Sequence, residues 1–361
     1  MIILKEKSDK TPFNQIMNTI QNINRSNNFD FLRLILASLV IVAHSYPLTK
    51  NKEILMILTN NQEDFGGFAV NGFFALSGYF IFLSLQRSKT ISNYFWKRIL
   101  RLYPALFGLM IFTLVLIPIL YVGNDLSSTI KNYWHYALNG LSLYRVKYFI
   151  AGIFENNPYK GAINGSLWTL SYEFTMYLLL IFLFFIRKNK ISLALLFIGF
   201  FISYWFFQTE NTFARQSFLK INLDTKHLYR LSTYFLAGSI ITFFDLKKIN
   251  TLPVRIGLFL LIVLSFILNI YSFVAPFTVT LLLILVGILN TTPINDLGDR
   301  FGDISYGVYI YGFLVQQIFM NYFNLNPLAL MVCSLMVTYF LAYFSWHLIE
   351  KKMLKFKNVI K

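Results

Sequence analysis

The sequence predicts an all-α fold, a polytopic membrane helical bundle of about ten transmembrane helices with both termini in the cytoplasm. Two observations on composition point to it. Of the 361 residues, 56% are hydrophobic and only 13% are charged, about half the charged share of a soluble domain. The mean hydropathy is +0.57. This composition excludes a disordered protein, a nucleic-acid module and an ordinary cytosolic enzyme.

The third observation is the spacing of the apolar segments, since a spanning helix needs about 20 mostly apolar residues. Ten segments meet this requirement: 31–48, 66–86, 104–122, 166–186, 191–207, 228–244, 256–272, 274–291, 305–324 and 327–349. The chain therefore divides into a cytoplasmic N-terminal segment (1–30), one transmembrane domain (31–349) and a cytoplasmic basic tail (350–361).

The distribution of basic residues predicts the orientation. An even number of spans places both termini on one side, and 22 of the 32 Lys and Arg residues fall on that side. Cytoplasmic loops carry the excess of Lys and Arg. We therefore interpret the net charge of +16 as loops beside anionic lipid, and we expect no nucleic-acid partner.

Cysteine and histidine usage predicts neither a disulfide framework nor a metal site. The chain has a single cysteine, Cys333, and four scattered histidines without an H-E-x-x-H motif. The first 28 residues lack the apolar core of a signal peptide, so we expect none there.

A charge inside a predicted span costs about 2.5–3.5 kcal/mol and marks a functional hypothesis, and three ionisable residues in the spans are candidates for a site. They are Arg33, His44 and Glu173. The eleven-residue spacing of Arg33 and His44 places both on one helix face, about 16 Å apart along the axis. Structural interpretations stay open: a packed histidine, an arginine that reaches lipid phosphate, and a carboxyl that satisfies another helix.

A basic stretch at 93–104 is interleaved with aromatic residues. If it is helical, Lys97, Arg98 and Arg101 share one side. This side is either an interfacial membrane anchor or a phosphate clamp for an anionic cofactor, because guanidinium groups bind phosphate with two hydrogen bonds.

Six motifs together resemble the acyltransferase-3 family of integral membrane acyltransferases, in the order of that family and over nearly the whole chain. They are F-D-F-L-R-L-I-L-A-S-L-V-I-V-A-H (29–44), N-G-F-F-A-L-S-G-Y (71–79), K-R-I-L-R-L-Y-P (97–104), G-S-L-W-T-L-S-Y-E (165–173), S-Y-G-V-Y-I (305–310) and H-L-I-E-K (347–351). The stand-alone O-antigen and exopolysaccharide O-acetyltransferases are the most similar members.

The chain departs from the family pattern in two ways. Gly312 stands where many members carry a histidine, so this position cannot perform acid–base chemistry. The C-terminal hydrolase-like domain of some members is not expected here, so the membrane domain must hand its acyl group directly to the acceptor or to a separate protein.

The resemblance implies a bacterial inner-membrane enzyme. Its co-substrate is an acyl-CoA, most often acetyl-CoA, with no permanently bound cofactor and no metal. Its acceptor is a cell-envelope polysaccharide or a lipid-linked oligosaccharide, and membrane lipids surround it. Basic groups at the inner surface, Arg33, Arg98 and Arg101, are expected to hold the nucleotide phosphates. Ser305 and Tyr306 are expected to contact the CoA.

The expected chemistry is acyl transfer with His44 as general base, because a sugar hydroxyl needs a base at neutral pH. Glu173 is expected either to orient His44 or to bind the glycan. The oxyanion needs a nearby donor, and the candidates are Asn71, Tyr306 and Trp168. Direct transfer and an acyl-histidine intermediate both stay open.

A different class of function fits the same residues. A glycan-lipid transporter or flippase would use Arg33, His44 and Glu173 as a substrate or proton pathway. The sequence shows no inverted halves, which counts against this class. A membrane-bound sensor is a third alternative. Dependence on acyl-CoA separates a transferase from both.

Overall fold

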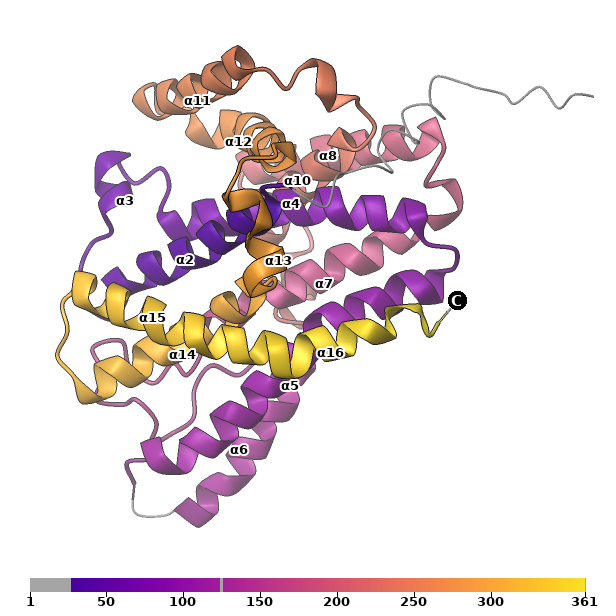
Figure 1. Cartoon of the computed structure of the whole chain (residues 1–361). Helices are drawn as coiled ribbons and strands as arrows, with labels where there is room; N and C mark the ends of the chain where they lie inside the picture. The colour runs from indigo at the N-terminus through magenta and orange to yellow at the C-terminus, as the bar shows by residue number, and fades with distance from the viewer. Residues whose placement is uncertain (1–26, 124–125, 361) are drawn as a thin grey trace, which may run out of the picture.

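The computed structural model describes residues 27–123 and 126–360, and every regular element in this part of the chain is a helix (Figure 1). The all-α prediction is therefore confirmed. Most of the predicted N-terminal segment 1–30 lies outside the described residues.

Each of the ten predicted spans coincides with a helix. These helices are α2 (Phe29–Leu48), α4 (Phe65–Arg87), α5 (Ile91–Leu120), α7 (Trp168–Ile181), α8 (Lys190–Gln208), α10 (Thr225–Ile241), α11 (Leu252–Ile267), α12 (Tyr271–Ile288), α14 (Ser305–Tyr322) and α15 (Pro327–Ser345). Within the described residues, six helices are long and apolar enough to cross a membrane: α2, α4, α5, α8, α12 and the continuous helical run from Pro327 to Asn358. The remaining four are shorter or less apolar, so ten crossings stay a prediction.

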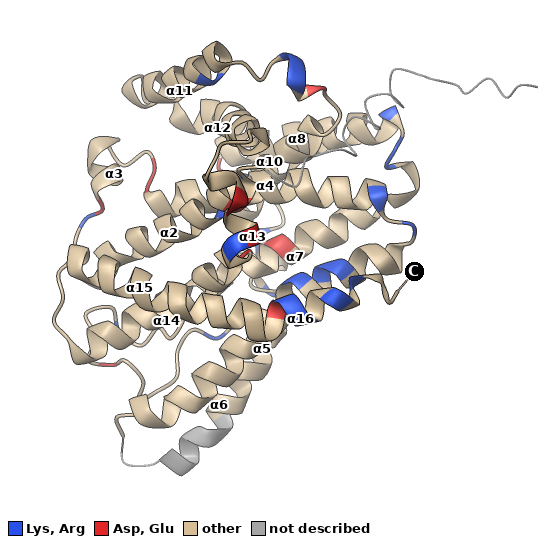
Figure 2. Cartoon of the chain, in the orientation of Figure 1, with Lys and Arg blue, Asp and Glu red and all other residues tan. Residues whose placement is uncertain are grey.

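Charged side chains avoid the flanks of these helices. Figure 2 shows Lys and Arg gathered on connecting loops and along the helical run after α15, which comprises η5 (Trp346–Glu350), α16 (Lys351–Met353) and η6 (Leu354–Asn358). This arrangement leaves apolar helix surfaces for contact with lipid.

One sizeable helix lies where the sequence predicted a loop. Helix α6 (Leu126–Leu141) occupies part of the segment 123–165 and packs against α5. It was missed because a search for long apolar runs does not find a helix with one apolar and one polar face. Shorter additions are α3 (Ile54–Leu58), α9 (Arg215–Leu219) and α13 (Leu297–Phe301).

Helix α5 begins at Ile91, well before the predicted start at residue 104, and it continues through Pro104. The side chain of Thr90 caps it by accepting a hydrogen bond from the backbone N–H of Asn93 (3.1 Å). The basic stretch is therefore the first part of a long helix. The sequence analysis missed this early start of α5, because the same amino-acid types occur in loops and at helix ends.

Helices α4 and α10 cross closely at the centre of the bundle. A Cβ atom on Gly78 would lie 1.8 Å from the carbonyl oxygen of Phe235, and one on Gly238 would lie 2.0 Å from that of Ala75. The hydroxyl of Ser239 donates to the carbonyl of Gly78 at 3.0 Å. Small residues such as Gly78 and Gly238 permit such approach between membrane helices.

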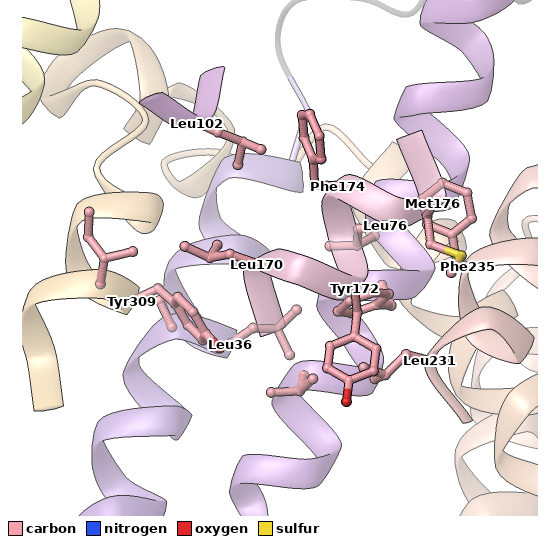
Figure 3. Packing of buried hydrophobic residues seen from close by; sticks show 14 of the residues in the cluster. Leu36, Leu76, Leu102, Leu170, Tyr172, Phe174, Met176, Leu231, Phe235 and Tyr309 are labelled. Atoms are coloured by element: carbon pink, nitrogen blue, oxygen red, sulfur yellow. The ribbon is translucent and has the colours of Figure 1, made fainter. Parts of the chain in front are cut away.

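Helix α7 is held by apolar contacts on several sides. Figure 3 shows its side chains Leu170, Tyr172, Phe174 and Met176 among buried residues of neighbouring helices. Because these contacts fix the rotation of α7 about its axis, they also fix the direction of Glu173.

Candidate active site

A cavity of about 370 Å³ lies between α2, α4, α5, α7, α14 and the helical run after α15. Exposed Lys357 lines one end, which is therefore open to solvent; we call this end the mouth. At the opposite end the lining includes Val70 and Thr169. On α4 the lining residues run from Val70 to Ile81, about 16 Å along the helix axis.

The cavity brings together six of the nine predicted site residues. They are Arg33, Arg98, Arg101, Glu173, Ser305 and Tyr306. His44, Asn71 and Trp168 do not line it. The predicted site residues therefore divide into two groups, one that lines the cavity and one in a second polar region near its closed end.

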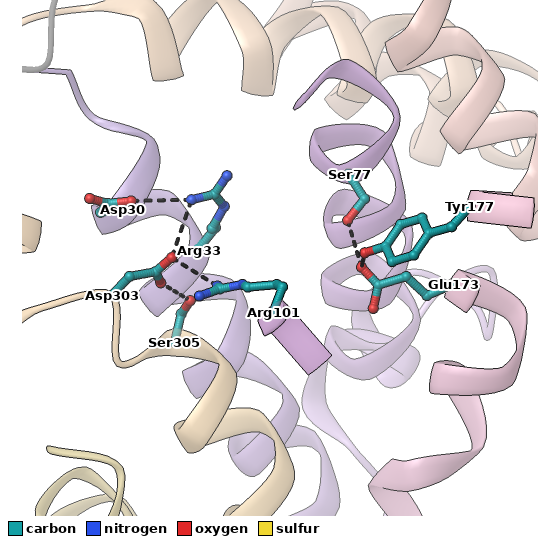
Figure 4. Close-up of polar contacts among 8 residues, drawn as sticks. All are labelled: Asp30, Arg33, Ser77, Arg101, Glu173, Tyr177, Asp303 and Ser305. Carbon is teal, nitrogen blue, oxygen red and sulfur yellow. Dashed lines mark hydrogen bonds and ion pairs between the residues drawn. The ribbon is translucent and has the colours of Figure 1, made fainter. Parts of the chain in front are cut away.

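Asp303, which the sequence analysis missed, organises the arginines of the cavity (Figure 4). Its carboxylate lies 2.8 Å from Nη2 of Arg101 and 3.5 Å from Nη1 of Arg33. Arg33 also pairs with Asp30 at 3.2 Å. Burial opposes the ionisation of Asp303, but Arg101 and Arg33 outweigh it and hold the pKa of this carboxyl below its ordinary value. Two of the three predicted phosphate-binding arginines therefore already have carboxylate partners.

Ser305 and Tyr306 join this cluster. The Ser305 hydroxyl donates to Asp303 at 2.6 Å, and the Tyr306 hydroxyl donates to the carbonyl of Leu102 at 3.1 Å. The guanidinium of Arg101 lies over the Tyr306 ring, 5.8 Å from its centroid. Both residues line the cavity, and their hydroxyls are engaged by the protein.

Arg98 differs from the other two arginines because none of the described carboxylates pairs with it within 4 Å. It donates to the hydroxyl of Ser84 at 3.1 Å and lies 5.8 Å from the ring centroids of Tyr94 and Tyr177. Its Nε atom is buried without a hydrogen-bond partner. A free donor on an unpaired guanidinium is suited to an anionic ligand.

Glu173 lies in the wall of the cavity between two hydroxyl donors (Figure 4). Its carboxylate accepts hydrogen bonds from Ser77 (3.0 Å) and from Tyr177. These partners hold it away from His44, so the structure gives no contact by which Glu173 would orient that histidine.

His44 lies one helical turn beyond the closed end of the cavity. Its ring meets the ring of Phe313 edge-on at 5.0 Å, and Phe313 follows the cavity-lining Tyr309 by four residues on α14. Arg33 faces Asp303, immediately before α14, so the two α2 residues share one face as their spacing predicts. The Nδ1 atom of His44 is buried without a hydrogen-bond partner, which leaves it available to a substrate.

Asn71 belongs to the polar region around the end of α2. It donates to the carboxylate of Glu63 at 3.0 Å, and its own Oδ1 is buried without a partner. Burial raises the pKa of Glu63 to about 7, and the charge of Arg230 opposes this rise. No sequence pattern indicated Glu63, because acidic residues in a predicted loop are ordinarily solvated.

Trp168 stands at the start of α7 in the same region, with its ring 4.7 Å from the ring of His227.

Packing explains why a glycine stands at position 312. A Cβ atom there would lie 2.7 Å from Cγ1 of Ile41, so α14 approaches α2 too closely for a side chain.

Comparisons with known proteins show which proteins the chain is similar to. A family model described as an acyltransferase domain matches residues 26–347. An O-acetyl transferase of Shigella phage Sf6 is 31% identical over 92% of this chain and 97% of its own length. Nodulation protein 10 of Rhizobium leguminosarum bv. viciae is 25% identical over 92% of this chain and 94% of its own. No solved structure matches.

The domain match spans α2, α4, α5, α7 and α14, which line most of the cavity, and it includes both Arg33 and His44. Together with the phage relative, which is similar from end to end, it identifies the chain as a member of the acyltransferase-3 family and thus as an acyltransferase.

Proposed function

We propose that this protein is a bacterial inner-membrane O-acyltransferase. It transfers an acyl group, acetyl in the first instance, from cytoplasmic acyl-CoA to a hydroxyl of a cell-envelope glycan. One observation carries the proposal: a cavity lined by three arginines ends one helical turn from a histidine with an unpartnered buried nitrogen. The O-acetyl transferase of phage Sf6 supports both the acetyl group and an oxygen acceptor.

The donor enters from the mouth. The guanidinium groups of Arg98, Arg33 and Arg101 bind the pyrophosphate of CoA. The phosphates partly replace Asp303 as the ion-pair partner of Arg33 and Arg101. The pantetheine arm then runs between the apolar walls of α4 and α7 toward Thr169. The thioester is thereby presented at the closed end, beside α2 and α14.

The acceptor approaches from the opposite end of the bundle. His44, as a neutral imidazole, takes the proton of the attacking hydroxyl while the oxygen bonds to the thioester carbon. The tetrahedral intermediate collapses, the carbon–sulfur bond breaks, and the proton goes to the CoA thiolate. Asn71 and Trp168 contact the glycan. Attack by His44 itself, which gives an acyl-histidine, uses the same geometry.

In this proposal the mouth opens to the cytoplasm. The Lys and Arg residues of α5, η6 and the loops beside them lie at this end of the bundle (Figure 2). The positive-inside rule therefore assigns this end to the cytoplasm, which is also where acyl-CoA is found. The unpartnered polar atoms around His44 then face the outer leaflet, where envelope glycans are modified.

The test uses the surface polysaccharide of the native host, analysed by proton NMR and mass spectrometry. Wild type is compared with a deletion strain and with the deletion complemented by His44→Ala. Loss of the same acyl-ester signal in both mutants supports the transferase and names the sugar position. An unchanged acylation pattern with altered export or chain length overturns it in favour of a glycan-lipid transporter.

A further inference from the structure

The mouth of the cavity carries three basic residues for which the described part of the chain offers no ion-pair partner. They are Lys97, Arg98 and Lys357, and all three line the cavity. Lys97 is repelled electrostatically by both Arg98 and Lys357. Deeper in the same cavity, Arg33 and Arg101 are paired with Asp303. The uncompensated charge therefore lies at the mouth.

Hydrogen bonds between α5 and the C-terminal segment keep these like charges close together. Lys357 comes from η6, which packs along the first turns of α5. The indole of Trp96 donates to the carbonyl of Phe356 at 2.9 Å, and the amide of Asn93 donates to the carbonyl of Ile360 at 2.6 Å. These two bonds flank Lys357 on either side in the sequence. Like charges kept together cost free energy unless an anion compensates them.

Only one lysine of this terminal run reaches the cavity. Lys351, Lys352 and Lys355 are exposed and do not line it, whereas Lys357 and its neighbour Leu354 do. A general membrane anchor would not need this selection, since all four would serve equally near anionic lipid. The placement of Lys357 opposite Lys97 fits a compact, doubly charged anion.

We propose that Lys97 and Lys357 form a subsite for a phosphomonoester, the 3′-phosphate on the ribose of CoA. The inference rests on the proposed function, in which CoA fills the cavity. The pyrophosphate lies just inside the mouth, between Arg98 and the paired arginines Arg33 and Arg101, and the 3′-phosphate remains between the two lysines. The subsite makes the enzyme selective for CoA over donors that lack this phosphate.

The experiment measures binding by isothermal titration calorimetry, using the full chain in detergent with CoA and dephospho-CoA as probes. We expect wild type to bind CoA about tenfold more tightly than dephospho-CoA, since charge contacts close to solvent contribute only modestly to affinity. Lys357→Gln weakens CoA binding about fivefold and dephospho-CoA binding less than twofold, and Lys97→Gln behaves in the same way.

The matched control is Lys355→Gln, which removes the same charge from the same run outside the cavity and leaves both affinities unchanged. Lys357→Arg retains the preference for CoA. Equal weakening of both ligands in Lys357→Gln, or an equal effect of Lys355→Gln, overturns the subsite and indicates a diffuse field. Failure of wild type to bind either ligand refutes the proposed donor itself.

A second arm separates free phosphate from lipid headgroups, which present the same chemistry. Binding is repeated in nanodiscs of phosphatidylcholine alone and with phosphatidylglycerol. We expect the preference for CoA to be present in both. A preference that anionic lipid abolishes, while Lys357→Gln has no effect in its presence, assigns the lysines to a lipid headgroup and overturns the proposal.

Discussion

The two ends of the site differ in whether their polar groups have partners within the protein. At the arginine cluster, Asp303 and Asp30 compensate Arg33 and Arg101, and Ser305 bonds to Asp303. Around His44 the polar atoms lack such partners: Nδ1 of His44 and Oδ1 of Asn71 are buried and unbonded. The cluster is stable without a ligand, whereas the His44 region depends on what binds there.

The largest effect is expected from His44→Ala. Loss of a general base lowers the transfer rate about 10²–10⁴-fold, because no other described side chain bonds to His44 or replaces it. Since His44 lies outside the cavity, CoA affinity changes less than twofold. Polysaccharide acylation and calorimetric CoA binding measure the two quantities. Equal loss of both would show that His44 supports the cavity and does not act as a base.

Glu173→Gln is expected to lower the rate about 10–100-fold, because it removes a charge that faces the donor while an oxygen remains for Ser77 and Tyr177. The matched control is Tyr177→Phe, which removes one hydrogen bond and leaves the carboxylate, with a loss of about fivefold. Full activity of Glu173→Gln would make this residue structural.

Asp303→Asn tests the arginine cluster, in which acidic side chains of the protein neutralise Arg33 and Arg101. It leaves Arg33 and Arg101 without their shared carboxylate and lowers the free energy of unfolding by about 2–3 kcal/mol. CoA then stabilises the variant more than it stabilises wild type, because its phosphates take the vacated role. Thermal unfolding with and without CoA measures both effects. Asp30→Asn is the control and costs less, since Asp30 contacts Arg33 alone and is more exposed. A smaller shift with CoA would show that Asp303 positions the arginines for phosphate.

The smallest effect is expected from Glu63→Gln and depends on pH. The folded pKa of Glu63, about 7, lies above its ordinary value of 4.5, so folding favours the neutral carboxyl. Its contribution to stability is complete below about pH 4.5 and is lost as the pH rises through 7. Glu63→Gln is therefore more stable than wild type at pH 8, by about 1–2 kcal/mol, and the gap narrows at pH 5.

Thermal unfolding between pH 5 and pH 8.5 measures this difference. Glu210→Gln is the control, because Glu210 is exposed and its removal leaves the pH dependence of wild type unchanged. A constant gap between wild type and Glu63→Gln across this range would contradict the buried neutral carboxyl.

Much of the fold could be predicted because hydropathy alone locates helices in an apolar chain. All ten predicted spans coincide with helices. The errors occur where hydropathy carries no information: α6 has one polar face, and the start of α5 is basic.

The site was only partly predictable, for a different reason. Arg33 and Glu173 are visible in the sequence because charge is costly inside a predicted span. Arg98 and Arg101 are visible because they belong to a basic stretch beside one. Their partners are not visible, since Asp303 lies 202 residues from Arg101 and 96 residues separate Ser77 from Glu173. Only the packing of distant helices decides which loop acid becomes a counterion and which, like Glu63, has its pKa raised by burial.

The crossing of α4 and α10 at Gly78 and Gly238 also has a consequence for motion. Backbone atoms of one helix there occupy the space that a methyl group would need on the other. These two helices cannot slide past each other without first separating, so they behave as one rigid body. A widening that admits a bulky donor is therefore expected in α5 and the terminal helical run, and the α4 wall is expected to keep the depth of the site constant.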